Sequence, residues 1–211
     1  MLKYHKFEFS PFAENTYLLW DDLTLEGMII DPGCYYDLEQ RELSGFIERF
    51  NIKVLFLINT HCHLDHIFGN NYLIKKYNLR HFAGKEDIPL LLNAPQQGSM
   101  FGVKLNEQTL PGEFLSEDIE LELGGFKIQP LYTPGHSPGE FSLFVESLTA
   151  CFTGDVLFKQ GIGRTDLWGG NYTQLISSIN KKLFVLPDET IILPGHGEKS
   201  TIGEEKINFK F

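Results

Sequence analysis

An α/β fold, in which helices cover β-sheets, is predicted by two features of this sequence. Short strand-like runs alternate along the chain with segments whose apolar residues recur at helical spacing. Hydrophobic residues make up 42% of the 211 residues and include 18 Phe, so a large core can be buried. No repeat or low-complexity linker interrupts the pattern, and we expect residues 1–211 to form a single domain.

The first quarter of the chain predicts three strands, one helix and a fourth strand. Residues 3–10, 15–20 and 26–31 are apolar or alternating runs separated by Pro, Asn and acidic residues. Residues 37–50 predict a helix, with Asp37 and Gln40 as a capping box. The continuous apolar run at 53–58, KVLFLI, is typical of a strand buried on both faces.

The rest of the chain continues the alternation, with one exception. A helix at 69–77 and a strand at 80–84 are followed at 89–111 by a stretch rich in Pro, Gly, Asn and Gln. We expect this stretch to be a long excursion, helical at its start, that could form a lid. A helix is also expected at 172–183, capped by Asn171 and Gln174. The remaining strands are expected at 118–124, 126–133, 140–145, 149–154 and 189–195.

Composition excludes several classes of protein. The formal charge of −10 argues against a nucleic-acid surface, which requires clustered Lys and Arg. No apolar run is long enough to span a membrane, and the N-terminal residues lack a signal-peptide pattern. Cys34, Cys62 and Cys151 are odd in number and match no zinc-ribbon spacing. These features predict a cytoplasmic protein with free thiols.

Histidines are concentrated in one short segment, THCHLDHIFGN at residues 60–70. Three of the seven histidines and one aspartate fall within six residues, as His61, His63, Asp65 and His66. Chance would produce His-x-His-x-Asp-His in roughly 4 of 10,000 chains of this composition. Alternate residues at a strand end point the same way, so His61 and His63 can bind one metal while Asp65 and His66 face a second. Imidazole and carboxylate ligands suit Zn²⁺, Fe²⁺ or Mn²⁺.

Two metals need more ligands, and further candidates follow other predicted strands. His136 lies in TPGHSPGE, Asp155 in FTGDVLF and His196 in LPGHGEK, each flanked by Gly or Pro. Functional residues gather at such carboxyl ends of strands in layered α/β proteins. The two histidines left over, His5 and His81, lie within strand-like runs and are expected to be ordinary structural residues.

These motifs, in this order from about residue 31 to residue 196, resemble the metallo-β-lactamase superfamily. HCHLDHIFGN, TPGHSPG, FTGDVLF, GIGRTDL and PGHG are most similar to its hydroxyacylglutathione hydrolase (glyoxalase II) branch and the short bacterial relatives of that branch. The resemblance implies a four-layer αβ/βα sandwich with a two-metal site at one edge. It implies that the first metal is bound by His61, His63 and His136, the second by Asp65, His66 and His196, and that Asp155 bridges them. Zinc is the expected metal, with iron or manganese as alternatives.

The implied activity is hydrolysis of a small-molecule thioester of the S-(2-hydroxyacyl)glutathione type, by a hydroxide that bridges the metals. Asp65 could also orient that hydroxide. The alternatives are a mononuclear iron persulfide dioxygenase, which the GRTD stretch also resembles, a hydrolase of another ester or lactone, and a metal-binding module without catalysis. Asp155 stands where exported metallo-β-lactamases usually have Cys, which argues against antibiotic hydrolysis. Neither a nucleic-acid nor a membrane partner is expected.

Substrate contacts are less determined by the sequence. Full-length glyoxalase II enzymes have a helical glutathione-binding domain after the last His, whereas only 15 residues follow His196 here. Arg164 takes the place of a cationic substrate-binding residue of the family, and Lys159 is a second candidate; a salt bridge between Arg164 and Asp166 is the alternative. Asp31 could orient a ligand imidazole or simply form a turn. We expect the aromatic residues Phe101, Trp168 and Tyr172 to be core residues rather than pocket walls.

Overall fold

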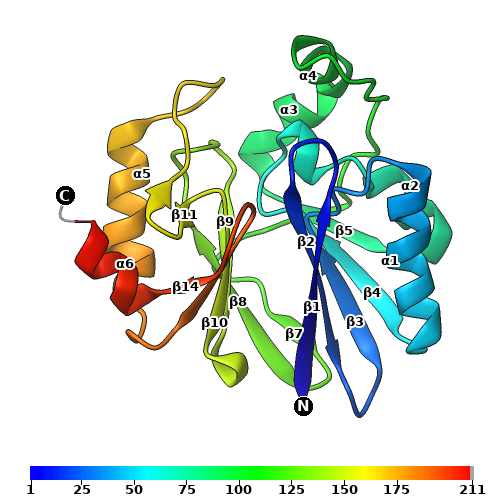
Figure 1. Ribbon diagram of the computed structural model, residues 1–211, viewed down its shortest axis with the longest axis horizontal. Helices are drawn as coiled ribbons and strands as arrows, with labels where there is room; N and C mark the ends of the chain where they lie inside the picture. Colours follow the sequence, from blue (N-terminus) through cyan, green and yellow to red (C-terminus); the bar gives the residue numbers. More distant parts are fainter. Residues whose placement is uncertain (210–211) are drawn as a thin grey trace.

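Two mixed β-sheets packed face to face, with helices on both outer faces, form the protein (Figure 1). The computed structural model describes residues 1–209. Its layers run helix, sheet, sheet, helix, which confirms the α/β class and the four-layer αβ/βα sandwich expected from the sequence. Among the described residues, no helix combines the length and apolarity needed to cross a bilayer.

The first sheet has six strands in sequence order, and every adjacent pair from β3 to β6 is parallel. The carboxyl ends of those strands therefore meet at one edge of the sheet. Its strands are β1 (Leu2–Phe9), β2 (Glu14–Asp21), β3 (Glu26–Ile30), β4 (Lys53–Ile58), β5 (Arg80–Ala83) and β6 (Glu113–Phe114).

The second sheet has the order β14-β13-β10-β9-β8-β7, with β10 and β13 parallel. Its strands are β7 (Leu121–Leu123), β8 (Phe126–Tyr132), β9 (Phe141–Val145), β10 (Ala150–Gly154), β13 (Ile191–Pro194) and β14 (Ser200–Thr201). The strands β11 (Leu157–Phe158) and β12 (Gly161–Ile162) form a separate small hairpin.

Each interface between layers has its own apolar cluster. Between the sheets, residues such as Leu19, Ile58 and Phe152 are almost completely buried. The outer face of the first sheet packs on α1 and α2, and that of the second packs on α5 and α6. The helices are α1 (Asp37–Arg49), α2 (Asn70–Tyr77), α3 (Ile88–Leu92), α4 (Ala94–Met100), α5 (Tyr172–Ser178) and α6 (Ile202–Asn208). Each fully buried large apolar side chain contributes about 1.5–3 kcal/mol, so these clusters hold the layers together.

The start of α1 corrects one expectation. The N-cap is Tyr36, one residue before the expected Asp37. The side chain that accepts from the backbone at the N-cap is that of Glu39, whereas Gln40 was expected in this role. One oxygen of Glu39 accepts from the backbone N–H of Tyr35 at 2.8 Å and of Tyr36 at 2.9 Å, and the other accepts from Ser10 at 2.8 Å. A carboxylate can satisfy three N–H groups, which an amide oxygen cannot do as well.

The expected excursion after residue 88 is helical at its start, as α3 and α4, and then has no regular structure from 101 to 112. The side chain of Asn71 holds this irregular part to α2. Its amide donates to the carbonyl of Glu107 at 2.8 Å, and its oxygen accepts from the N–H of Thr109 at 2.9 Å. A backbone N–H at Lys104 also donates to the hydroxyl of Tyr35.

The two C-terminal helices differ in how far the sequence predicts them. The helix expected at 172–183 is present as α5 and continues through a wider π turn, Ile179–Leu183. Asn171 caps it by accepting from the N–H of Gln174 at 3.0 Å, as expected. The helix α6 was not expected, although Thr201 with Glu204 matches the capping pattern of a helix start.

Candidate metal centre

The seven candidate ligands meet where loops leave four strands at one edge of the β-sandwich. His61 and His63 follow β4, His136 follows β8, Asp155 follows β10 and His196 follows β13. Both histidines lie just beyond the strand expected at 53–58, because β4 ends at Ile58. The backbone is still extended at His63, with φ −66° and ψ 155°, so the two imidazoles converge.

The first group consists of His61, His63 and His136, all buried. The His63 Nδ1 atom lies 2.8 Å from the His136 Nε2 atom, which lies 3.3 Å from the His61 Nε2 atom. Nitrogen ligands bound about 2.0–2.1 Å from one tetrahedral Zn²⁺ are roughly 3.3 Å apart. These three nitrogens are therefore close enough to share a cation.

The second group consists of Asp65, His66 and His196. The Asp65 Oδ2 atom lies 3.1 Å from the His196 Nε2 atom and 3.9 Å from the His66 Nε2 atom. His196 is the most accessible of the three, with 28% of its side chain exposed. The group therefore has one member open to solvent, where a substrate could approach.

Asp155 contacts both groups. Its Oδ2 atom lies 3.6 Å from the His136 Nε2 atom of the first group and 3.6 Å from the His196 Nε2 atom of the second. Its Oδ1 atom lies 3.5 Å from the His66 Nε2 atom. A carboxylate placed between two sets of nitrogens can bind a cation on each side, which is the geometry expected of a bridging ligand.

The residues fit metal ions by two further tests. The His66 Nε2 and Asp155 Oδ1 atoms are buried and have no hydrogen-bond partner among the described residues. Unsatisfied buried polar atoms are costly unless something binds them. Burial, reinforced by neighbouring imidazoles, lowers the pKa of His61 well below its usual value and that of His63 to about 3. Both imidazoles are thus neutral, as ligands must be.

The carboxylates of the centre are held in the ionised form. Burial favours the neutral acid, but the adjacent His66 outweighs it and lowers the pKa of Asp155. The pKa of Asp65 is lowered in the same way by His66 and by the hydrogen bond with His196. Negative charge on Asp65 and Asp155 is what a cation site requires.

Neighbouring groups orient the ligand imidazoles. The His136 Nδ1–H group donates to the carbonyl of Arg164 at 2.7 Å, and because a carbonyl only accepts, the Nε2 lone pair must face the first group. Asp31 Oδ2 lies 3.1 Å from the His66 Nδ1 atom, and the same carboxylate accepts from the N–H of Thr60 at 2.7 Å and from its hydroxyl at 2.5 Å. This placement favours the orienting role over the simple turn for Asp31.

Two buried carboxyl residues near the centre, Glu140 and Glu14, are not marked by any motif in the sequence. Glu140 is fully buried, lies 3.6 Å from the His61 Nδ1 atom and accepts from the N–H of Asp155 at 2.9 Å. Glu14 is also fully buried and accepts from Thr16. Burial raises the pKa of both carboxyls well above the usual range. No sequence motif identifies Glu140 and Glu14, because they come close to the ligands only when the chain has folded.

The structural role expected for His5 and His81 is consistent with their surroundings. His81 is buried and its Nε2 atom lies 2.8 Å from the Asn59 Oδ1 atom. The amide of Asn59 donates to the carbonyl of His66 at 2.8 Å, so His81 supports the loop of the second group from behind. His5 stacks on Phe46, with ring centroids 4.5 Å apart.

A cavity of about 200 Å³ opens above the candidate ligands. Its apolar walls come from separate parts of the chain, and Phe101, which was expected in the core, is one of them. Arg164 is on the rim and makes two 2.7 Å hydrogen bonds to Asp166. The lining residues are Phe12, His63, Leu64, Asp65, Phe101, His136, Asp155, Arg164, Leu167 and His196.

Three other predicted residues lie outside this cavity. Lys159 forms a 2.5 Å ion pair with Glu198 and lines a different cleft, together with Tyr4, Lys6 and Lys199. The expectation that Trp168 and Tyr172 belong to the core is wrong, since they are 56% and 58% exposed. Trp168 lies in the loop before α5, and Tyr172 is the first residue of that helix.

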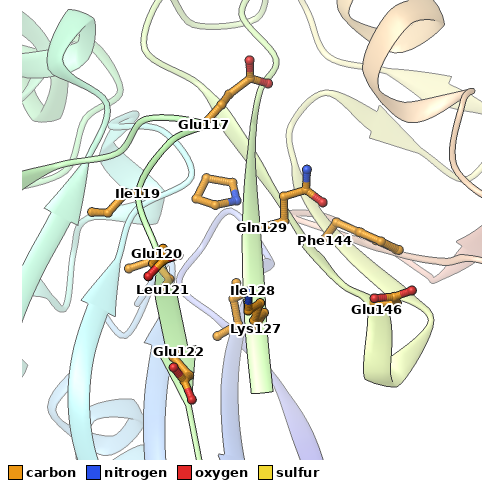
Figure 2. A pocket seen from close by; sticks show the side chains of 11 residues that line it. Glu117, Ile119, Glu120, Leu121, Glu122, Lys127, Ile128, Gln129, Phe144 and Glu146 are labelled. Atoms are coloured by element: carbon orange, nitrogen blue, oxygen red, sulfur yellow. The ribbon is translucent and has the colours of Figure 1, made fainter. Parts of the chain in front are cut away.

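A second hollow, of about 230 Å³, shares no lining residue with the metal-centre cavity. Figure 2 shows Glu117, Glu120 and Glu122 on one side of it, and Gln129 and Phe144 on the other. It contains no histidine and no buried carboxylate among its lining residues. Convergent polar groups with shifted pKa values distinguish a reactive site from an ordinary hollow, so the metal-centre cavity is the candidate active site.

Comparisons with known proteins agree with this geometry. The family model described as the metallo-beta-lactamase superfamily matches residues 10–196, a range that contains all seven candidate ligands. The chain is 39% identical over 204 residues to hydroxyacylglutathione hydrolase GloC of Haemophilus influenzae, covering 96% of this chain and 94% of that protein. It is 34% identical over 206 residues to the probable metallo-hydrolase YqgX of Bacillus subtilis, covering 97% and 95%.

Solved structures are similar over most of the chain. The BLEG-1 B3 metallo-beta-lactamase has a TM-score of 0.89 at 32% identity and covers 97% of both chains. The protein TTHA1623, in a di-iron-bound form, has a TM-score of 0.84 at 31% identity and covers 96% of both. These similarities extend to proteins whose names imply different substrates and metals.

Proposed function

The chain belongs to the metallo-β-lactamase superfamily, a superfamily of metallo-hydrolases, and we propose that it hydrolyses small thioesters of the S-(2-hydroxyacyl)glutathione type at a two-metal centre. One observation carries the two-metal part of the proposal. Asp155 contacts both three-residue groups, so a single carboxylate can bind a cation on each side. The similarity to the hydroxyacylglutathione hydrolase of H. influenzae supports the substrate class.

Each ligand group would hold one divalent cation, with Asp155 between them. The first cation would be bound by His61, His63 and His136, and the second by Asp65, His66 and His196. We propose zinc, because neutral imidazoles and carboxylates suit it; iron and manganese accept the same ligands. Two such cations supply a nucleophilic hydroxide at neutral pH and polarise a substrate carbonyl.

The residues of the cavity account for the remaining steps. Phe12, Leu64, Phe101 and Leu167 provide apolar walls that bind the acyl portion and displace water from the reacting carbonyl. The Asp65 carboxylate, at the centre of the second group, accepts a hydrogen bond from the attacking water and so orients it. No imidazole is left over as a general base, because every histidine that lines the cavity belongs to a ligand group.

Arg164 is proposed to bind a carboxylate of the thiol carrier. It lines the rim of the cavity, and its partner Asp166 is two residues away on an exposed loop. An exposed ion pair contributes little because water screens both charges, so a substrate carboxylate can replace Asp166. Lys159 lies outside the cavity and is therefore the weaker candidate for this role.

The test is steady-state hydrolysis of S-D-lactoylglutathione by zinc-loaded protein, followed by loss of thioester absorbance, with the metals counted in the same sample. We expect two metals per chain and a kcat/KM of about 10⁴ M⁻¹s⁻¹ or more, the range of real substrates. Oxygen consumption with an iron-loaded sample and a persulfide would instead support the dioxygenase. Turnover of a chromogenic cephalosporin without thioester hydrolysis would contradict the proposed substrate class.

A further inference from the structure

Asp87 is a buried carboxylate that the proposed chemistry does not use. It lies between β5 and α3 with no exposed surface, and it is not one of the residues that line the cavity. Its Oδ2 atom accepts from the backbone N–H of Cys62 at 2.9 Å. Its Oδ1 atom accepts from the N–H of Gly139 at 2.6 Å and from the hydroxyl of Ser137.

These three donors come from the two loops that carry the first ligand group. Cys62 stands between His61 and His63, and Ser137 directly follows His136. Asp87 thus connects, through one side chain, the two stretches of backbone from which all three imidazoles of the group project. A charge-assisted hydrogen bond is stronger than a neutral one, so the connection is firm.

The second ligand group is held in a different way. The carbonyl of His66 accepts from the amide of Asn59, and Asp31 faces the imidazole of His66. Asp87 makes no hydrogen bond to the residues of that group. A substitution at Asp87 should therefore change the metal affinity of the first group more than that of the second.

Glycines bring the Asp87 segment against the His136 loop. A Cβ atom on Gly84 would lie 1.8 Å from the carbonyl oxygen of Gly139, and a Cβ on Gly139 would lie 2.6 Å from the Asp87 nitrogen. Neither position can carry a side chain while this contact is kept. The backbone N–H of Phe141 donates to the carbonyl of Thr60 at 2.9 Å, which joins the two loops where they meet their strands. Asp87 joins the same loops beside the ligand histidines.

We propose that Asp87 is a positioning residue that sets the distance between the His61–His63 loop and the His136 loop, and so the affinity of the first metal site. The proposal rests on the proposed two-metal centre, but only on its metal binding and not on the substrate. Groups that orient metal ligands from behind typically change metal affinity by 10- to 100-fold when they are lost.

The Asp87→Asn substitution removes one link of the connection without changing the side chain's size. An amide has one acceptor oxygen, so if it still accepts from Ser137 and Gly139, its NH₂ group faces the N–H of Cys62. Two donors facing each other push the His61–His63 loop away from His136. We expect the first site to bind metal 10- to 100-fold more weakly, with the second site changed by less than threefold.

The experiment is a Co²⁺ titration of metal-free protein, read by the visible absorption of the bound ion and by metal content after dialysis. The matched control is Glu205→Gln, since Glu205 is another fully buried carboxylate, in α6, that accepts from the N–H of Gln160 at 2.8 Å and from Ser200. We expect this control to lower the melting temperature of the metal-free protein as Asp87→Asn does, while both Co²⁺ affinities stay normal. Ser137→Ala, which removes only the hydroxyl link, should weaken the first site by a few-fold.

Two results would overturn the positioning role. One is a loss of Co²⁺ affinity in Asp87→Asn that is equal at both sites, which is what general destabilisation would produce. The other is unchanged affinity at both sites in Asp87→Asn and Ser137→Ala. Failure of the unsubstituted protein to hydrolyse thioesters would contradict the proposed substrate but leave this measurement intact.

Discussion

The Arg164→Met substitution tests the proposed contact between Arg164 and a carboxylate of the substrate. Methionine keeps an unbranched apolar stem but removes the guanidinium with all five N–H donors. The backbone carbonyl of Arg164, which orients His136 at 2.7 Å, is retained in the variant. The substitution therefore removes the charge at the rim without removing the orientation of a ligand imidazole.

The size of the effect follows from the exposure and pairing of the guanidinium. Asp166 accepts hydrogen bonds from the Nε and Nη2 atoms, and because the Arg164 side chain is 55% exposed, a substrate carboxylate can replace Asp166. A hydrogen bond to a charged group contributes about 1.5–3 kcal/mol where it is well shielded, and exposure to water reduces this. We expect KM for an anionic thioester to rise about tenfold, with kcat unchanged, since the contact is the same in the ground state and the transition state.

The assay compares S-D-lactoylglutathione with a neutral thioester for Arg164→Met and for the matched variant Lys159→Met. Lys159 also forms an exposed ion pair, but it lines another cleft, so its replacement should leave both KM values within twofold. The neutral substrate should be insensitive to both changes. If Arg164→Met raised KM equally for the two substrates, or if Lys159→Met raised KM as much for the anionic one, the assignment of Arg164 would be refuted.

Three further predictions concern the centre and its support. Asp65→Ala should reduce the metal content from two ions to one and lower kcat by about 100-fold or more; full activity would contradict a two-metal mechanism. Burial lowers the pKa of His81 to about 4, so the unfolded chain binds its proton first as the pH falls. The contribution of His81 to the free energy of unfolding should be fully present above pH 6.5 and should fall by about 3 kcal/mol towards pH 4. Urea unfolding of His81→Gln should lack this part of the pH dependence. Asn71→Ala releases both hydrogen bonds to the irregular segment and should speed its proteolysis in the 101–112 region, with Asn106→Ala as the unaffected control; equal rates would contradict a tether at Asn71.

The candidate ligands could be found in the sequence because each one lies in a loop that leaves the carboxyl end of a recognisable strand. Strands such as KVLFLI are recognisable as apolar runs, and parallel strands place their carboxyl ends at one edge, so a histidine just beyond one of them has a predictable position. The layer order came from the family resemblance and not from the pattern itself.

The residues behind the ligands could not be found in this way. Glu140 and Asp87 accept hydrogen bonds from residues 15 to 52 positions away in the sequence, and Glu14 lies near His66 only because the fold brings them together. A sequence pattern records local spacing, whereas these contacts exist only after the sheets have packed. The predicted cap of α1 was wrong for a local reason. Glu39 is next to Gln40 in the sequence, and its carboxylate forms stronger hydrogen bonds with the N–H groups at the helix start.

The irregular segment from 101 to 112 has a consequence for how such proteins can be altered. The seven candidate ligands all lie outside it, whereas Phe101, at its start, is a wall of the cavity. Side chains of Asn71 and Tyr35 hydrogen-bond to its backbone, and its Leu105 is buried. Reactive chemistry and the shape of the space offered to a substrate are thus encoded in different parts of the chain. A library that exchanges residues 101–112 between relatives should change which acyl groups are accepted while every member keeps the same complement of metals.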